Sequence, residues 1–123
     1  MQRETRQRRA IRSTLVETGH PMSPKELLEV AQHHVDGLGI ATVYRNLKSL
    51  QDEGIVTAVE LPGEPPRYEM AGKEHHHHFH CRLCDKVYEV DGCPGNVRSM
   101  TPSGFQTERH ELVLYGLCER CAA

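Results

Sequence analysis

Two Cys-x-x-Cys pairs constrain this chain more than any other feature of its sequence. Cys81 and Cys84 end a histidine-rich stretch that begins at Glu69, and Cys118 and Cys121 lie near the end of the sequence. Each pair can hold a metal ion through a tight turn, and two such pairs are typical of a tetrahedral zinc site with four thiolate ligands. Two disulfides are the alternative, but this spacing without a secretory signal favours zinc. We therefore expect all four cysteines to bind a structural zinc ion.

The histidines before the first pair are expected to have a different role. Side chains alternate between the two faces of a strand, so His76 and His78 would share one face, and His75 and His77 the other. One short strand could thus supply ligands to two separate metal sites. The run is internal and continues to Cys81, which argues against an expression tag. Imidazoles with carboxylates suit divalent zinc, iron, manganese, nickel or cobalt, and affinity order alone does not choose among them.

Length and composition exclude several classes of protein. A chain of 123 residues has room for one ordinary domain or two very small ones, and because small domains bury little core, structural zinc would supply stability. Tryptophan is absent and aromatic residues make up 5%, so no large apolar pocket for a small organic ligand is expected. No apolar run approaches the roughly 20 residues of a membrane span. The first residues do not lead into a secretory signal, so we expect a soluble, cytoplasmic protein without membrane contact.

Positive charge gathers at the start of the chain, although the formal net charge is −2. Residues 3–12 contain five arginines against one acid, Glu4. This segment is a candidate for contacts to DNA phosphates, with Arg6 and Arg8 as the expected anchors. A solvated helix face is the alternative.

Hydrophobic spacing and turn residues predict three helices in the first half. Residues 10–18 follow helical spacing up to Gly19, and residues 23–26 combine a capping box with proline at the first helical position. A third helix is expected to run to a stop at Gly54, with an apolar stripe formed by Ile40, Val43, Leu47 and Leu50. Two short strands, 55–60 and 67–70, would follow around a proline-rich turn.

Three helices followed by a hairpin are the order of a winged helix-turn-helix domain, whose third helix enters the major groove of double-stranded DNA. The exposed face of that helix would then supply the DNA contacts Thr42, Tyr44, Arg45 and Lys48. A three-helix domain that does not bind DNA is the alternative. We expect an α+β architecture, with the winged helix at 1–70, a hinge at 71–74, and a small α/β zinc-containing dimerisation domain at 75–123.

In the second half, strands are expected at 79–81 and 87–90, which would form a hairpin around the first Cys-x-x-Cys turn. A further strand is expected at 105–115, with at most a short helix at 96–101. The last strand would bring His110 back toward the histidine cluster. Three strands with exposed edges and little core favour pairing with a second copy, so we expect a homodimer.

Taken together, these motifs resemble those of the ferric uptake regulator family. The resemblance covers nearly the whole chain and rests on Gly39-Ile40-Ala41-Thr42-Val43-Tyr44-Arg45, Arg67-Tyr68-Glu69, the segment from His75 to Cys84, and the segment from His110 to Cys121. It implies a dimeric, metal-responsive DNA-binding repressor and not an enzyme. Such a repressor would bind an inverted-repeat operator and control metal-homeostasis genes.

The resemblance also implies further metal ligands. A regulatory site at the hinge would bind Zn2+ or Fe2+, with Mn2+ and Ni2+ as weaker candidates, through Glu69, His76, His78, Glu89 and His20. The family pattern has one residue fewer between this last histidine and the serine that caps the next helix. A third site, in the dimerisation domain, would use His75, His77 and His110.

The sequence departs from the family pattern around that third site. The segment between Val90 and Gly104 is shorter than usual, and Asn96 stands about where the pattern has a glutamate. Either the third site is absent and Cys93 is a spare thiol, or Cys93 or Asp91 completes it.

Three other functions remain as alternatives. A small zinc hydrolase with Glu69 or Glu89 as general base would need a substrate cleft, for which little chain is left. A peroxide-sensing repressor of the same family is a closer alternative, but such sensors favour aspartate where this chain has Glu69 and Glu89. A thiol-redox role would need a parallel βαβ unit around the cysteine pairs, which the pattern does not predict. A metal sensor is therefore the preferred interpretation.

Overall fold

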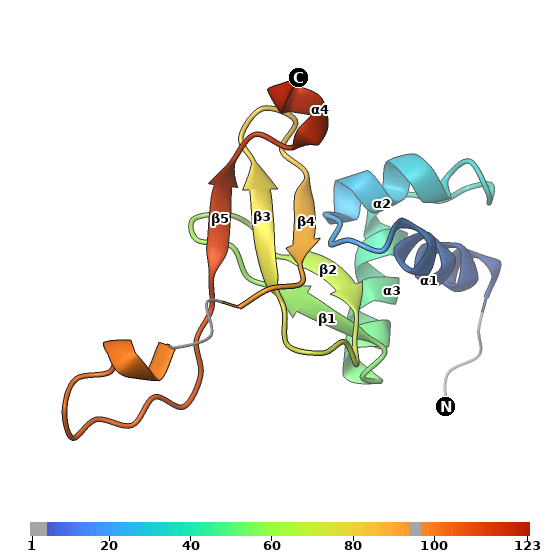
Figure 1. The fold of residues 1–123 in the computed structure, drawn as a ribbon. Helices are drawn as coiled ribbons and strands as arrows, with labels where there is room; N and C mark the ends of the chain where they lie inside the picture. The colour runs from blue at the N-terminus through green and yellow to red at the C-terminus, as the bar shows by residue number, and fades with distance from the viewer. Residues whose placement is uncertain (1–4, 94–96) are drawn as a thin grey trace. The chain divides into compact units, whose positions relative to one another are not determined.

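The computed structural model describes residues 5–93 and 97–123, so Glu4 and Asn96 lie outside the described residues. It separates into two compact units, Met1–Lys73 and Glu74–Ala123. The elements of the first unit are α1 (Arg6–Thr18), α2 (Pro24–Ala31), α3 (Ile40–Asp52), β1 (Val56–Val59) and β2 (Arg67–Met70) (Figure 1). Those of the second are β3 (His77–Cys81), β4 (Val87–Val90), the 3-10 helix η1 (Val97–Met100), β5 (Val113–Gly116) and α4 (Glu119–Ala122). No described helix has the length and hydrophobicity of a membrane span.

The helices of the first unit begin and end where local chemistry favours it. The Thr5 hydroxyl accepts a hydrogen bond from the backbone N–H of Arg8 at the start of α1. Gly19 ends this helix with a φ of 69°, a left-handed conformation that glycine adopts without strain. Ser23 and Glu26 form a complete capping box at the start of α2. The predicted stop at Gly19 and the predicted capping box are therefore confirmed.

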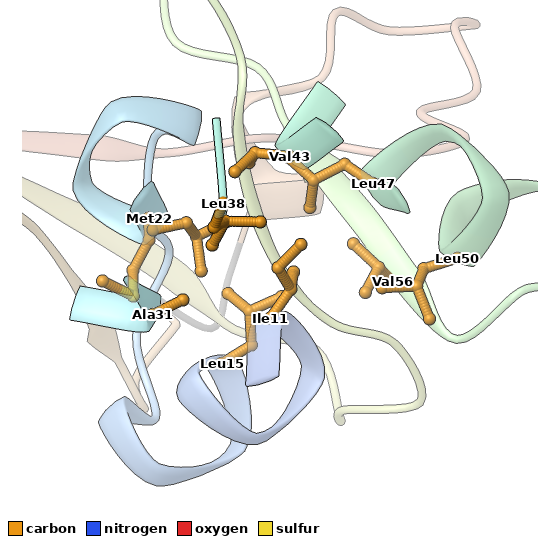
Figure 2. Packing of buried hydrophobic residues seen from close by; sticks show 10 residues of the cluster. Ile11, Leu15, Met22, Ala31, Leu38, Val43, Leu47, Leu50 and Val56 are labelled. Carbon is orange, nitrogen blue, oxygen red and sulfur yellow. The ribbon is translucent and has the colours of Figure 1, made fainter. Parts of the chain in front are cut away.

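One hydrophobic core holds the first unit together. Side chains from the three helices and β1 converge in it, as Figure 2 shows, and its members are Ile11, Leu15, Met22, Leu27, Ala31, Leu38, Val43, Leu47, Leu50 and Val56. The predicted stripe of α3 is confirmed for its last three residues. Ile40 is instead 43% exposed, because the first residue of a helix has packing neighbours on only one side.

Truncating Leu47 tests this core. The Leu47 side chain is 1% exposed, so Leu47→Ala leaves a cavity and should lower the free energy of unfolding by about 2–5 kcal/mol. Urea denaturation followed by the helical signal of the zinc-loaded protein measures this loss. The control is Val16→Ala on α1, where the side chain is 59% exposed and the expected change is within about 0.5 kcal/mol. Equal unfolding midpoints for Leu47→Ala and the wild type would contradict the assignment of Leu47 to the core.

The second unit is built on a sheet of order β4-β3-β5 (Figure 1). The predicted antiparallel hairpin of β3 and β4 is confirmed, whereas β5 runs parallel to β3 and places Gly116 opposite Cys81. Because parallel strands end at the same edge of a sheet, the segments that follow β3 and β5 start next to each other. A Cβ at position 116 would lie 3.3 Å from the ring of Phe79, so a larger residue there would require this ring to shift by a few tenths of an ångström.

The long strand predicted over residues 105–115 is wrong in its first part. Only Val113–Gly116 forms a strand, and residues 105–112 are irregular. A strand needs a neighbour to receive its backbone hydrogen bonds. β3 begins at His77, and Val113 already pairs with His78, so the earlier residues extend beyond the partner strand.

Candidate metal centres and the exposed face of α3

Four cysteines meet at the edge of the sheet where β3 and β5 end. Cys81 is the last residue of β3, and the turn after it closes when the backbone N–H of Asp85 donates to the Cys81 carbonyl at 2.9 Å. Cys118 follows β5, and its N–H donates to the Cys81 sulfur at 3.4 Å. The sulfur atoms of Cys81, Cys84, Cys118 and Cys121 all lie within 4.8 Å of one another. The structure thus brings together the four cysteines that the sequence grouped.

These sulfur positions fit a zinc tetrahedron. Zinc–sulfur bonds of about 2.3 Å place neighbouring sulfurs about 3.8 Å apart. The Cys84 and Cys118 sulfurs are 3.8 Å apart. Backbone N–H donors, that of Cys84 first, lower the pKa of Cys81 to about 5. Hydrogen bonding to neighbouring sulfurs, that of Cys118 first, raises the pKa of Cys121 to about 12. A divalent cation in place of that proton would offset half of the negative charge of four thiolates.

The turn after β3 contains a further contact that the sequence does not reveal. Nε2 of His80 lies 2.7 Å from a carboxylate oxygen of Asp85, and Asp85 adopts a left-handed φ of 64°. The contact fastens the turn that follows Cys81 to the end of β3. Sequence reasoning misses it because a histidine in a histidine run carries no signal that separates a turn contact from a metal ligand.

The histidines divide between the two faces of the strand, as the alternation predicted. The rings of His76 and His78 have centroids 4.8 Å apart, and those of His75 and His77 have centroids 4.6 Å apart. Glu89 lies directly opposite His78 in the β3–β4 pairing, so both side chains lie on the same face of the sheet. Two imidazoles and a carboxylate of the expected regulatory site therefore gather on one face of the second unit.

The other two expected regulatory ligands belong to the first unit. Glu69 lies in β2 opposite Thr57, and a carboxylate oxygen of Glu69 is 4.0 Å from Nζ of Lys73. His20 follows the glycine that ends α1, and its Nδ1 lies 3.1 Å from the carbonyl oxygen of Pro21. Both residues carry donor atoms suited to a divalent metal.

A further group of donors lies on the opposite face of β3. It consists of His75, His77, Cys93 and His110, whose ligand atoms lie within 4.8 Å of one another. Nε2 of His110 is 3.2 Å from Nε2 of His75 and 3.2 Å from Sγ of Cys93. His77 is 2% exposed, and this burial, with the neighbouring rings, lowers the pKa of His77 and favours the neutral imidazole. Of the two side chains left as alternatives by the sequence, the group contains Cys93 and not Asp91.

α3 presents an exposed polar face. Tyr44 is 54% exposed, and Arg45 and Lys48 are exposed as well. Thr42 is half-buried, and its hydroxyl accepts a hydrogen bond from the Arg45 guanidinium at 3.1 Å. Arg6 is exposed at the first position of α1. These side chains combine hydrogen-bond donors, positive charge and an aromatic ring, which is the chemistry of a DNA-contacting surface.

Arg8 does not belong to this surface, so its expected role in DNA binding is corrected. Its guanidinium is buried and donates hydrogen bonds to the carboxylate of Glu53 and to the Ser49 hydroxyl. The hydrogen bond from Arg8 lowers the pKa of Glu53. If the Arg8 side chain turned outward, it would leave the Glu53 carboxylate unpaired and would lose its own packing contacts. Arg8 therefore joins α1 to the end of α3 and is not available to a phosphate.

Comparisons with known proteins identify the family. The model of the Ferric uptake regulator family matches residues 2–115. The ferric uptake regulation protein of Campylobacter jejuni subsp. jejuni serotype O:2 is 34% identical over an alignment of 123 positions. The match covers 95% of this chain and 78% of that protein. The ferric uptake regulator of Helicobacter pylori, which has three functional metal-binding sites, superposes with a TM-score of 0.76 at 26% identity, covering 98% of this chain and 83% of that chain. A zinc-bound manganese uptake regulator gives a TM-score of 0.81 at 28% identity, with coverage of 95% and 91%. The chain belongs to the ferric uptake regulator family and is a metal-responsive transcriptional repressor.

Proposed function

We propose that this repressor senses zinc(II) or iron(II) through a regulatory site whose ligands come from both units, and that it controls metal-homeostasis genes. The observation that carries the proposal is the grouping of His76, His78 and Glu89 on one face of the second unit, in which the two histidines follow closely after the boundary between the units. Glu69 and His20 of the first unit would complete the ligand set.

The donor chemistry of this set supports a transition metal. Three imidazoles and two carboxylates suit zinc and iron, and manganese or nickel would also be accepted, since affinity order alone does not select the metal. The set contains no thiol, so it differs in softness from the four-cysteine site. Zinc in the cysteine site would serve structure, whereas the mixed site would respond to the changing metal supply.

Metal binding would be coupled to DNA binding because the proposed ligands come from both sides of the segment that joins the units. When Glu69 and His20 share an ion with the ligands of the second unit, the orientations open to the winged helix become fewer. DNA half-sites about one helical turn apart, or a multiple of it, select one spacing of the two winged helices in a dimer. The response can be no larger than the difference in metal affinity between the DNA-competent state and the other states.

The DNA-contacting residues that we propose are those on the exposed face of α3, together with the start of α1. Arg45 and Thr42 would reach base edges, and Tyr44, Lys48 and Arg6 would contact the backbone of an inverted-repeat operator. Exposure of Tyr44, Arg45 and Lys48 supports this assignment.

Homodimerisation through the second unit is part of the same proposal. β5 is an edge strand of the sheet and carries the exposed side chains of Leu114 and Tyr115. Edge strands with apolar side chains favour pairing with another chain. A dimer of this kind would bind one half of an inverted repeat with each winged helix. It would act as a regulator in the cytoplasm and not as an enzyme.

Fluorescence anisotropy tests the proposal on the purified protein and an inverted-repeat DNA of the family type. After the zinc content is counted, the protein is titrated separately with zinc(II), iron(II), manganese(II) and nickel(II). One of these metals should tighten DNA binding about 10-fold or more, which corresponds to a coupling of about 1.4 kcal/mol. If no metal changes the affinity of a protein that already holds one zinc ion per chain, the regulatory site that we propose does not exist.

A further inference from the structure

The side chain of Lys73 lies between β2 and the end of α1, the two places from which the first unit would supply regulatory ligands. Glu69 lies in β2, and His20 follows Gly19, the residue that ends α1. Nζ of Lys73 is 4.0 Å from a carboxylate oxygen of Glu69 and 3.5 Å from the backbone carbonyl oxygen of Gly19. All of these residues belong to the first unit. A positive charge of the protein itself thus lies beside an expected metal ligand.

Both neighbours of the Lys73 ammonium attract a cation. Glu69 is buried, and a buried carboxylate is costly unless a positive charge or hydrogen bonds compensate it. The carbonyl of Gly19 stands at the C-terminal end of α1, where the helix dipole leaves partial negative charge. In the metal-free protein Lys73 therefore supplies positive charge at the place where a bound metal ion would supply it.

The hydrogen bond of His20 leaves one ring nitrogen suited to a metal. Its Nδ1 lies 3.1 Å from the carbonyl oxygen of Pro21, and because a carbonyl only accepts, the proton is assigned to Nδ1. The lone pair of the neutral ring is then on Nε2. A metal bound by this nitrogen and by Glu69 would have to take the carboxylate from Lys73. The lysine can give way, since its stem is flexible and 27% of its side chain is exposed.

We propose that Lys73 competes with the regulatory metal for Glu69 and thereby sets the metal concentration at which this repressor responds. The ammonium must leave the carboxylate before a divalent ion can bind there, and it repels that ion as long as it stays nearby. Both effects weaken metal binding although Lys73 is not a ligand. Because the competition is one of charge, it raises the threshold for every divalent metal alike. The inference rests on the proposed function, since it takes Glu69 as a ligand of the regulatory site.

The test measures metal affinity directly, with manganese(II) as the probe ion. Manganese prefers oxygen ligands to thiolates and stands lowest in the affinity order of the first-row divalent metals, so it should leave structural zinc in place. The full-length chain is titrated after its zinc is counted, and electron paramagnetic resonance measures the free manganese. Lys73→Gln should lower the manganese dissociation constant about 10-fold, the order that repulsion between a single and a double charge a few ångströms apart gives in water.

Two matched variants separate charge at this position from charge in general. Lys73→Arg keeps a permanent positive charge beside Glu69 and should keep the wild-type dissociation constant. Lys25→Gln removes the same charge from an exposed position of α2, where solvent and salt screen it, and should also leave the dissociation constant unchanged.

Anisotropy titrations with DNA give a second readout, which a purely structural role of Lys73 would not produce. In Lys73→Gln the midpoint of the manganese response should fall by the same factor of about 10 as the dissociation constant. The affinity for DNA at saturating manganese should equal that of the wild type. A changed affinity at saturating manganese would show that Lys73 supports the fold of the first unit, and it would overturn the proposal.

A chain with His76→Ala and His78→Ala distinguishes failure of this inference from failure of the proposed function. If the wild type binds a manganese ion that this chain does not bind, the regulatory site exists. An equal or larger dissociation constant in Lys73→Gln would then overturn the role of Lys73 alone. If the wild type and the double histidine variant bind manganese equally, the regulatory site is wrong, and the inference fails with it.

Discussion

Replacing Cys81 with serine is expected to remove the structural zinc and to unfold the second unit. Serine lacks the thiolate that zinc requires, and the remaining cysteines cannot close the tetrahedron. Structural zinc contributes about 10–16 kcal/mol of apparent binding free energy in zinc-finger peptides, whereas whole domains are stable by about 5–15 kcal/mol. Among the described hydrophobic residues of this unit only Cys81 and Val87 are buried, so no apolar core can replace the lost ion.

The first unit should survive this substitution, because its own core does not involve the cysteines. Metal analysis should find less than one zinc per chain in Cys81→Ser, with the helical circular dichroism signal largely retained and dimerisation lost. His33→Ala is the control, since this exposed histidine of the first unit belongs to none of the proposed metal sites. Full zinc content and an unchanged thermal transition in Cys81→Ser would show that the cysteine site does not hold the second unit together.

The elements that could be predicted from sequence are those that local chemistry determines. Gly19 ends a helix, Ser23 and Glu26 form a capping box, and alternation places His76 and His78 on one face whatever the rest of the chain does. Each Cys-x-x-Cys pair is equally local, since each forms its own turn. The parallel pairing of β3 with β5 then brings both turns to one edge, and no local pattern announces that pairing.

The features that sequence reasoning missed depend on contacts between distant residues. Arg8 lies in a basic segment and looks like a phosphate ligand, but Glu53, forty-five positions away, draws it into the unit. For Cys93 the sequence left two interpretations open, a spare thiol or a metal ligand, and only the structure places its sulfur beside His110. Its position three residues after a predicted strand was a usable signal, because that strand was expected to pair with the histidine strand.

Replacing His76 and His78 together with alanine is expected to abolish the metal response while leaving a folded dimer that contains zinc. Both side chains lie on the face of Glu89, away from the four cysteines in the sheet, so the structural site should keep its ion. DNA binding should then stay at its metal-free level at every metal concentration, which removes the stimulation of about 10-fold or more expected for the wild type. A metal favours the DNA-competent state only if it binds that state more tightly than the others. A chain without the ligands binds no metal at this site, so the metal cannot change its affinity for DNA.

Anisotropy titrations of the double variant measure this loss, with His33→Ala and His34→Ala as the control. The control removes two exposed histidines of the first unit and should respond to metal as the wild type does. If the double variant still bound DNA more tightly in the presence of metal, another site would have to be the sensor. If Cys93→Ser alone then removed that response, the histidine and cysteine group on the opposite face would be the sensor.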